Sequence, residues 1–254
     1  MGDSHYDQAF FAREAVNSLN SARIVVPILT ELLHPQSVID VGCGMGGWLK
    51  AFAENGVTRL RGVDGDYVER SKLLIDPDCF SAVDLQHPFN LPGKYDFALC
   101  LEVAEHIPEK YAPRLVDALT GSAPLILFSA AIPGQKGQGH VNERWPSYWR
   151  RLFARHAFSM LDPIRPCVRE DRRVMWWYRQ NLLLFVSPAA LANNRRLETM
   201  ARSPNVDLEW IHRTVARGLK SRESDNEWVV ADALTRWSTT GRVARALRAL
   251  LKGF

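Results

Sequence analysis

The sequence has few cysteines, and their spacing has no pattern that would pair them. Four cysteines are scattered over 254 residues, at Cys43, Cys79, Cys100 and Cys167, and no CxxC pair occurs. A disulfide framework or a zinc ribbon needs closer and more regular spacing, so the sequence argues against both. This usage is typical of a protein that folds in a reducing compartment.

Long apolar runs are also lacking, as are internal repeats and low-complexity tracts. No early apolar block has the form of a signal peptide, and no run is long enough to span a bilayer. We therefore expect a cytoplasmic protein. Positive charge is in small excess. The net charge of +4 permits an anionic partner but does not require one.

The composition that remains is ordinary for a globular protein, with 46% hydrophobic and 24% charged residues. Short β-rich segments alternate with segments of helical spacing. Strands are expected at 37–42, 59–64, 80–85, 95–101 and 124–133. Helices are expected at 12–35, 48–56, 102–121 and 143–158, the third of them interrupted by Pro108 and Pro113. This alternation predicts an α/β fold, a mostly parallel sheet with helices on both faces.

Two further strands are expected late in the predicted domain, at 159–168 and 181–187. Little helical material is expected between them, so they should pair antiparallel at the edge of the sheet. The composition shifts after residue 188. We therefore expect a domain at 1–190, whose residues 1–35 form a helical cap, followed by a C-terminal helical extension at 191–254.

A glycine-rich turn stands between the first strand and the following helix, in SVIDVGCGMGGWL. Gly42, Gly44 and Gly46 occupy alternate positions there. Such a turn lets the backbone approach a nucleotide-like ligand closely. Gly42, Gly44 and Gly47 also satisfy GxGxxG, so a dinucleotide remains an alternative. Asp64 lies about twenty residues further on and would hold ribose hydroxyls in either case.

Three surrounding motifs resemble those of the class I S-adenosylmethionine-dependent methyltransferases. Asp40 lies two positions before Gly42, VDL places Asp84 in the third strand, and LEVAEHIP follows the fourth strand. The resemblance covers roughly residues 37–187. It implies a Rossmann-like sheet of seven strands with S-adenosylmethionine over its carboxyl edge. The cofactor-binding residues that it implies are Asp40, Gly42, Cys43, Gly44, Gly46, Asp64, Asp84, Leu85 and Leu101.

The segment EVAEHIP offers groups that bind a metal or move a proton. If it opens a helix, Glu102, Glu105 and His106 stand at i, i+3 and i+4 and share one face. His140 follows the fifth strand, whose loop should open on the same edge of the sheet. The ExxEH spacing resembles that of the ubiquinone-pathway O-methyltransferases and the small-RNA 3′-terminal 2′-O-methyltransferases.

Our hypothesis is that these four residues bind one divalent cation, Mg²⁺ or another, which orients and acidifies a substrate hydroxyl. Two alternatives stay open. In one, His140 or His106, with Glu105 nearby, catalyses the reaction as a base without metal. In the other, the segment has a structural role only.

The acceptor is expected to bind between residues 134 and 181, where aromatic and planar polar side chains gather. Such groups suit sugar rings, and also bases or aromatic metabolites. Three glycines in 134–139 make a mobile lid conceivable. Trp149 and Phe153 are expected in the core. Trp176 and Trp177 would point to opposite faces if their segment is extended. The predicted substrate-binding residues are Asn142, Glu143, Trp145, Trp177, Tyr178 and Arg179.

The arrangement from HVNERWPSYW to WWYRQN is similar to bacterial methyltransferases of glycan and natural-product biosynthesis. The leading hypothesis is therefore O-methylation of a sugar hydroxyl on a glycan or glycosylated small molecule. The alternatives are an N- or O-methyltransferase of a secondary metabolite, an RNA 2′-O-methyltransferase, and a non-catalytic partner subunit. Nucleic acid is not expected as a partner, because no RNA-binding module is recognisable.

The last fourteen residues, 241–254, have the pattern of an amphipathic basic helix. Its apolar stripe is expected to pack on the body or on a second copy in a homodimer. Peripheral contact with an anionic membrane is the alternative.

Overall fold

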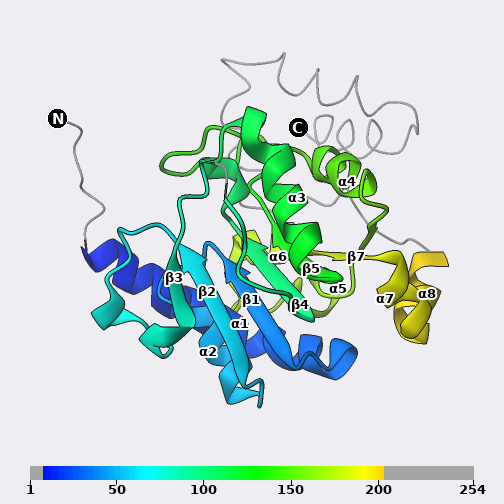
Figure 1. The fold of residues 1–254 in the computed structure, drawn as a ribbon, viewed down its shortest axis with the longest axis horizontal. Coiled ribbons are helices and arrows are strands. Elements are labelled where there is room, and N and C mark those ends of the chain that lie inside the picture. The colour runs from blue at the N-terminus through cyan, green and yellow to red at the C-terminus, as the bar shows by residue number, and fades with distance from the viewer. Residues whose placement is uncertain (1–7, 88, 203–254) are drawn as a thin grey trace, which may run out of the picture. The chain divides into compact units, whose positions relative to one another are not determined.

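In the part of the chain that the structure describes, seven strands form one sheet, and each lies inside a segment for which the sequence predicted a strand. The computed structural model describes residues 8–87 and 89–202. The strands are β1 (Ser37–Val41), β2 (Arg59–Asp64), β3 (Phe80–Ala82), β4 (Phe97–Leu101), β5 (Leu125–Ser129), β6 (Ser159–Leu161) and β7 (Leu183–Val186). Their order is β3-β2-β1-β4-β5-β7-β6 (Figure 1). β7 runs antiparallel to β5 and β6, and the other pairs are parallel, which confirms the predicted α/β fold with its antiparallel edge.

The central strands are buried on both faces, as a parallel sheet between helices requires. Successive residues alternate between two apolar cores: Leu99 and Leu127 belong to one, and Cys100 and Ile126 to the other. The apolar runs of β1, β4 and β5 therefore follow from burial on both sides.

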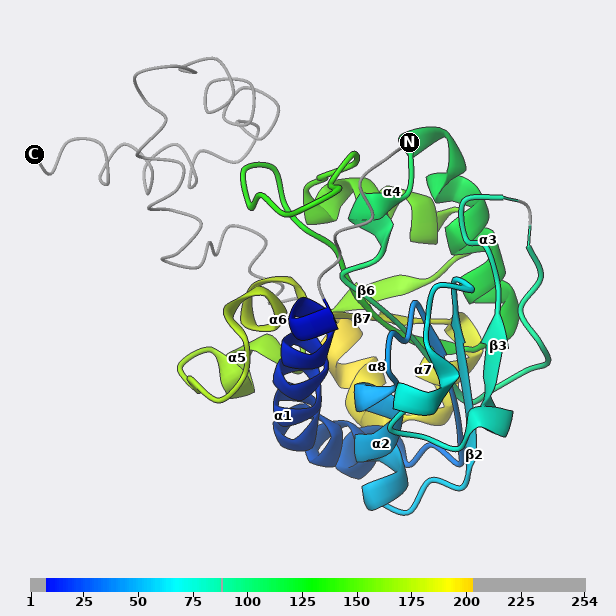
Figure 2. The same cartoon turned by 90° about the vertical axis from the view of Figure 1, so that its left-hand side faces the viewer.

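Helices cover both faces of the sheet. α1 (Gln8–Leu33) and α2 (Gly47–Glu54) lie on one face, and α3 (Ala112–Ser122) and α4 (Pro146–Ala154) on the other (Figures 1 and 2). Among the described side chains of α1, the fully buried apolar ones are Ala22, Val25, Val26 and Leu29, at the spacing of one helical face. Trp149 and Phe153 of α4 are buried, as expected.

The helical segment predicted over 102–121 is interrupted at Pro108, as expected, but the interruption expected at Pro113 is not found. Short 3₁₀ turns η3 (Ala104–His106) and η4 (Glu109–Tyr111) precede α3, which begins at Ala112. Pro108 interrupts any continuous helix, because proline has no N–H to donate. Pro113 is tolerated in the first turn of α3. Two further 3₁₀ turns, η1 (Arg70–Lys72) and η2 (Pro77–Cys79), lie between β2 and β3.

The connection between β6 and β7 is helical, contrary to expectation. The strand predicted over 159–168 ends at Leu161, and α5 (Arg165–Val168) and α6 (Trp176–Asn181) follow. Trp176 and Trp177 are therefore consecutive helical residues about 100° apart on α6, and they do not face opposite sides of an extended segment.

β7 is followed by α7 (Pro188–Asn193) and α8 (Arg195–Arg202), so α7 spans the boundary predicted at residue 190. The chain divides into two units, Met1–Leu208 and Glu209–Phe254. The second unit, with the amphipathic segment 241–254, lies outside the described residues. Among the described helices, none has the length and apolar character needed to cross a membrane.

Candidate active site

The carboxyl ends of β1, β2, β4 and β5 meet at one edge of the sheet, because these strands are parallel. The segments that follow them begin at Gly42, Gly65, Glu102 and Ala130. These segments carry most of the predicted site residues. In open α/β sheets this edge is where ligands bind.

The glycine turn after β1 is shaped by two different requirements. Gly42 has φ +81°, and a Cβ there would lie 2.2 Å from Val103 Cγ2, so packing excludes a side chain. Gly44 has φ +53°, and a Cβ there would meet nothing within 4 Å. The backbone at Gly44 thus borders open space in which a ligand can approach it.

The carboxylate of Asp64 links the end of β2 to this turn. It is buried; its Oδ2 accepts a hydrogen bond of 2.7 Å from the Gly44 N–H, and its Oδ1 accepts one of 2.7 Å from the Gly65 N–H. The hydroxyl of Tyr67, an exposed side chain, also donates to Oδ1. Asp64 therefore stands beside the glycine turn, where the sequence predicted a ribose-binding carboxylate.

Asp40 lies beneath the turn, in β1, and is 2% exposed. Burial, and then the neighbouring Asp64 carboxylate, raise its pKa to about 7. A cation bound nearby would favour the ionised form of this carboxyl. The charge of a sulfonium or ammonium group is suited to this place.

The other predicted cofactor residues are spread along the same edge. Cys43 and Gly46 belong to the turn, where the Gly46 N–H donates to the Cys43 carbonyl at 2.9 Å. Leu101 is the last residue of β4 and is buried. Asp84 and Leu85 follow β3; the exposed Asp84 carboxylate accepts from the Gln86 N–H and pairs with His87.

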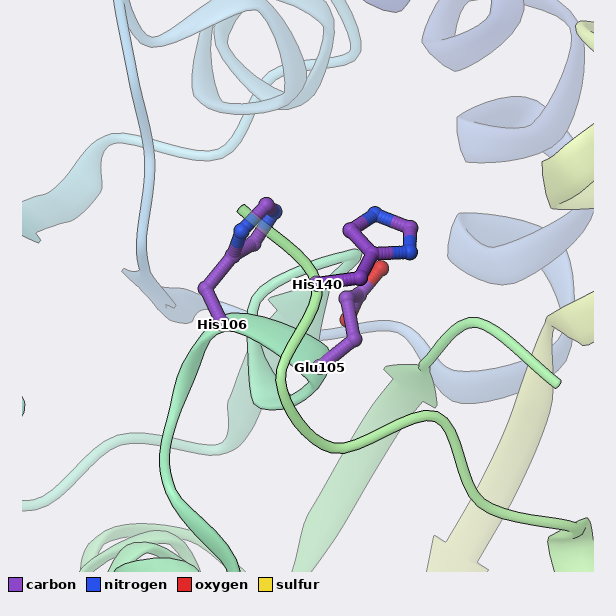
Figure 3. Close-up of side chains that lie close together, drawn as sticks. All are labelled: Glu105, His106 and His140. Atoms are coloured by element: carbon purple, nitrogen blue, oxygen red, sulfur yellow. The ribbon is translucent and has the colours of Figure 1, made fainter. Parts of the chain in front are cut away.

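Three side chains converge above the ends of β4 and β5: Glu105, His106 and His140. One ligand atom from each lies within 4.8 Å of the other two. Figure 3 shows that Glu105 and His106 come from the segment after β4 and His140 from the segment after β5. The two imidazole rings are 5.0 Å apart and nearly perpendicular. The structure thus joins residues separated by 34 positions in the sequence.

Glu105 is fully buried, and among the described residues no donor meets either carboxylate oxygen in hydrogen-bond geometry. Burial, and then the Glu102 carboxylate, raise the pKa of Glu105 well above its ordinary value. Burial, followed by the nearby His140, lowers the pKa of His106, so its imidazole is neutral near pH 7. A buried carboxyl group with no well-formed hydrogen bond, beside a neutral imidazole, is a suitable environment for a cation, which would favour the ionised form of Glu105.

Glu102, the fourth predicted ligand, lies outside this group of three. Its φ is +55°, and its carboxylate accepts from Gln135 Nε2 at 2.9 Å and Asn181 Nδ2 at 3.0 Å. Asn181 also donates to Gln135 Oε1 at 2.9 Å. This partly buried network links the segment after β4, the segment after β5 and the end of α6. The sequence did not predict that Gln135 and Asn181 meet Glu102, because these contacts span 33 to 79 residues and leave no local pattern.

The predicted substrate residues on the loop after β5 mainly hold that loop in place. Asn142 is buried, with its N–H donating to the Glu105 carbonyl at 3.0 Å. Glu143 pairs with His140 at 2.9 Å. Trp145 is half-buried and directly precedes α4.

The remaining predicted substrate residues belong to α6. Tyr178 is buried, and its ring packs edge-on against Trp48 with centroids 5.2 Å apart. Trp177 is half-buried, and Arg179 donates to the Arg169 carbonyl at 3.1 Å. α6 therefore contacts the first turn of α2, close to the glycine turn.

Comparison with known proteins identifies the family. Residues 13–221 match a family described as a methyltransferase domain. This match covers most of the chain, so the protein belongs to that family. The class expected from the sequence, an S-adenosylmethionine-dependent methyltransferase, is thereby confirmed. Among curated proteins, none matches the chain in sequence.

The chain is also similar to several solved structures. The magnesium protoporphyrin IX methyltransferase of Synechocystis PCC 6803, crystallised with S-adenosylmethionine, is 21% identical; 73% of this chain and 86% of that one align with a TM-score of 0.48. The plantazolicin methyltransferase BpumL is 14% identical over 72% and 92% of the two chains, with a TM-score of 0.48. LaPhzM is 16% identical over 71% and 58%, with a TM-score of 0.50.

Proposed function

We propose that this methyltransferase transfers the methyl group to a hydroxyl oxygen, with a divalent cation held by Glu105, His106 and His140. One observation carries the proposal: the convergence of these three side chains at the sheet edge that also carries the glycine turn. A hydroxyl is a poor nucleophile at neutral pH and needs a base or a metal ion. A nitrogen acceptor would have less need of such a cluster.

The residues at the glycine turn fit the cofactor. S-adenosylmethionine, when bound, supplies a methyl group attached to a cationic sulfur. The acceptor attacks the methyl carbon in line and the sulfur leaves. The open space beside Gly44 admits a ligand against the backbone. The buried carboxyl of Asp40 favours a positive charge nearby, and Asp64 offers a carboxylate for ribose hydroxyls.

The three converging side chains fit a metal ion by their chemistry. They provide one carboxylate oxygen donor and two imidazole nitrogens, a mixed set that suits manganese, iron or zinc better than magnesium. A cation there would also satisfy the buried Glu105 carboxylate, which has no donor in hydrogen-bond geometry among the described residues. The ion, when bound, would orient an acceptor hydroxyl and lower its pKa. Because Nδ1 of His140 is paired with Glu143, the His140 ring would keep one orientation beside that hydroxyl.

For the acceptor we propose a sugar hydroxyl of a glycan or a glycosylated small molecule. Adjacent hydroxyls of a sugar can approach one cation together. The half-buried Trp145 and Trp177 offer flat apolar faces of the kind on which sugar rings stack. These features support the acceptor class without selecting one compound.

Labelling tests the acceptor. The full-length protein is incubated with methyl-labelled S-adenosylmethionine and with glycan, lipid, RNA and non-glycosylated small-molecule pools from its host. We expect label in the glycan pool or in a glycosylated compound. Label confined to RNA or to non-glycosylated compounds would overturn the acceptor proposal.

Chelation and one substitution test the metal. After exhaustive chelation we expect turnover to be lost and S-adenosylhomocysteine binding to persist, with turnover restored by Mn²⁺. E105Q should abolish Mn²⁺ binding measured by paramagnetic resonance, whereas E31Q, at an exposed position on α1, should not change it. Undiminished turnover after chelation would contradict the metal proposal.

A further inference from the structure

Glu143 pairs with His140 from outside the group of three converging side chains. Its Oε1 lies 2.9 Å from His140 Nδ1 and accepts the Lys136 N–H at 2.9 Å, while Oε2 accepts the Gly134 N–H at 2.8 Å. Both oxygens are thus engaged by the loop after β5, which also carries His140. The sequence predicts Glu143 as a substrate-binding residue, but these contacts are internal to the loop.

The hydrogen bond determines where the imidazole carries its proton. An ionised carboxylate only accepts hydrogen bonds, so Nδ1 of a neutral His140 must be the protonated nitrogen. Both carboxylate oxygens of Glu143 already accept backbone N–H groups, Oε1 from Lys136 and Oε2 from Gly134, so Glu143 acts as a hydrogen-bond acceptor in this loop.

The ring is also confined on another side. A Cβ at Gly137 would lie 2.1 Å from His140 Nε2, so the imidazole occupies the space that any other residue would fill with its side chain. This close approach explains the glycine without any need for an unusual φ. Glu143 and Gly137 together leave the His140 ring little freedom to rotate.

His106 is held in the same way by the same loop. Its Nδ1 lies 3.3 Å from the Gly139 carbonyl oxygen, which can only accept, so Nδ1 of neutral His106 is again the donor. Both imidazoles then have their lone pair on Nε2. The loop over 134–143 therefore sets the protonation pattern of both rings.

We infer that Glu143 is a positioning residue: it fixes the orientation and the Nδ1–H tautomer of His140, so that Nε2 is the nitrogen available to a cation or an acceptor proton. The identity of what Nε2 receives rests on the proposed function. The tautomer and its dependence on Glu143 follow from the contacts of the loop alone. A carboxylate behind a histidine typically changes metal affinity or activity about 10- to 100-fold when it is removed.

Nitrogen NMR tests the inference directly. The full-length protein is labelled with ¹⁵N-histidine, and long-range ¹⁵N–¹H correlations are recorded about two pH units above the ordinary imidazole pKa. The His140 signals are assigned from an H140Q spectrum. We expect the Nδ1–H pattern in the wild type. In E143A we expect a shift toward the Nε2–H pattern.

A conservative variant and a control separate positioning from loop stability. E143Q keeps an acceptor oxygen for His140 and should retain the Nδ1–H tautomer, although it loses the second acceptor oxygen. E31A, at an exposed position, should leave the His140 signals unchanged. Turnover of E143A is expected to fall about 10- to 100-fold, E143Q should fall less, and S-adenosylhomocysteine binding should remain as in the wild type.

Two results would overturn the inference: an Nε2–H tautomer of His140 in the wild type, or an unchanged tautomer in a folded E143A protein. Its failure is distinguishable from failure of the proposed function. If the tautomer responds to E143A while turnover resists chelation and H140Q, the proposed function fails and the positioning by Glu143 stands.

Discussion

Gly42 and Gly44 have left-handed φ angles in the same turn, but different neighbours require glycine at each. At Gly42 a side chain would collide with Val103, whereas at Gly44 it would enter open space. The motif GCG does not distinguish these two roles. The local sequence indicates only that each glycine can adopt a positive φ, and it does not indicate what a side chain would meet there. Their environments differ because Val103 comes from the segment after β4.

Substituting the two glycines should separate stability from cofactor binding. G42A should lower the free energy of unfolding by about 2 kcal/mol or more, through overpacking against Val103 and backbone strain. G44A should cost about 1 kcal/mol from its φ alone, yet weaken S-adenosylhomocysteine binding at least tenfold. Denaturant titration and calorimetry measure the two quantities. An unchanged affinity of G44A for S-adenosylhomocysteine would show that the ligand does not contact the backbone at Gly44.

At the level of elements, the site is built by loops that hold one another in place. The loop after β5 contacts the segment after β4 through backbone bonds from Val141 and Asn142 to the Glu105 carbonyl. It contacts the end of α6 through Gln135 and Asn181. Glu105 and His106 lie in the 3₁₀ turn η3, before α3 begins at Ala112. The chain therefore positions these two side chains in a loop held by its neighbours and not on a continuous helix.

The amide of Asn181 should prove important for the whole group of loops. N181A removes one of the two amide donors to the buried Glu102 carboxylate, and we expect the free energy of unfolding to fall by about 2 kcal/mol. Denaturant titration measures this change. N90A, at an exposed loop position, is the matched control and should change stability by less than about 0.5 kcal/mol. Equal effects of the two substitutions would show that the network does not stabilise the fold.

At the level of the whole molecule, the two cores enclose a carboxyl at the centre of the sheet. Asp40 keeps its proton to about pH 7 in the folded protein, whereas the unfolded chain releases it near pH 4. Between these values the folded state binds more protons than the unfolded state. The free energy of unfolding should therefore decrease as pH rises from about 4 to about 7.

D40N should remove this dependence in the cofactor-free protein. Three pH units of difference correspond to an energy on the order of 4 kcal/mol, so D40N should be the more stable protein at pH 8 by up to that amount. Denaturant titrations at several pH values check it, with D66N at an exposed position as the control. A parallel decline in wild type and D40N would show that other groups cause it.

The sequence alone predicted the strands, the two-sided helical cover and the glycine turn. These features depend on short-range patterns: apolar runs such as 125–129, the spacing of Ala22, Val25, Val26 and Leu29, and glycines between a strand and a helix. The motifs around Asp40, Asp84 and 102–106 also predicted the class of enzyme. Each of these signals lies within a few residues of chain.

Only the tertiary structure decided how the site is assembled. The sequence predicted that Glu105, His106 and His140 would lie together, but the structure placed Glu102 with Gln135 and Asn181. It also set Glu143 behind His140. It also turned the segment around Trp176 and Trp177 into a helix against α2. These arrangements depend on contacts between segments that are distant in the sequence. The contacts form only when the parallel strands bring the loops that follow them to one edge of the sheet. Local patterns record which residues are present, but the packing of the whole sheet determines which of them meet.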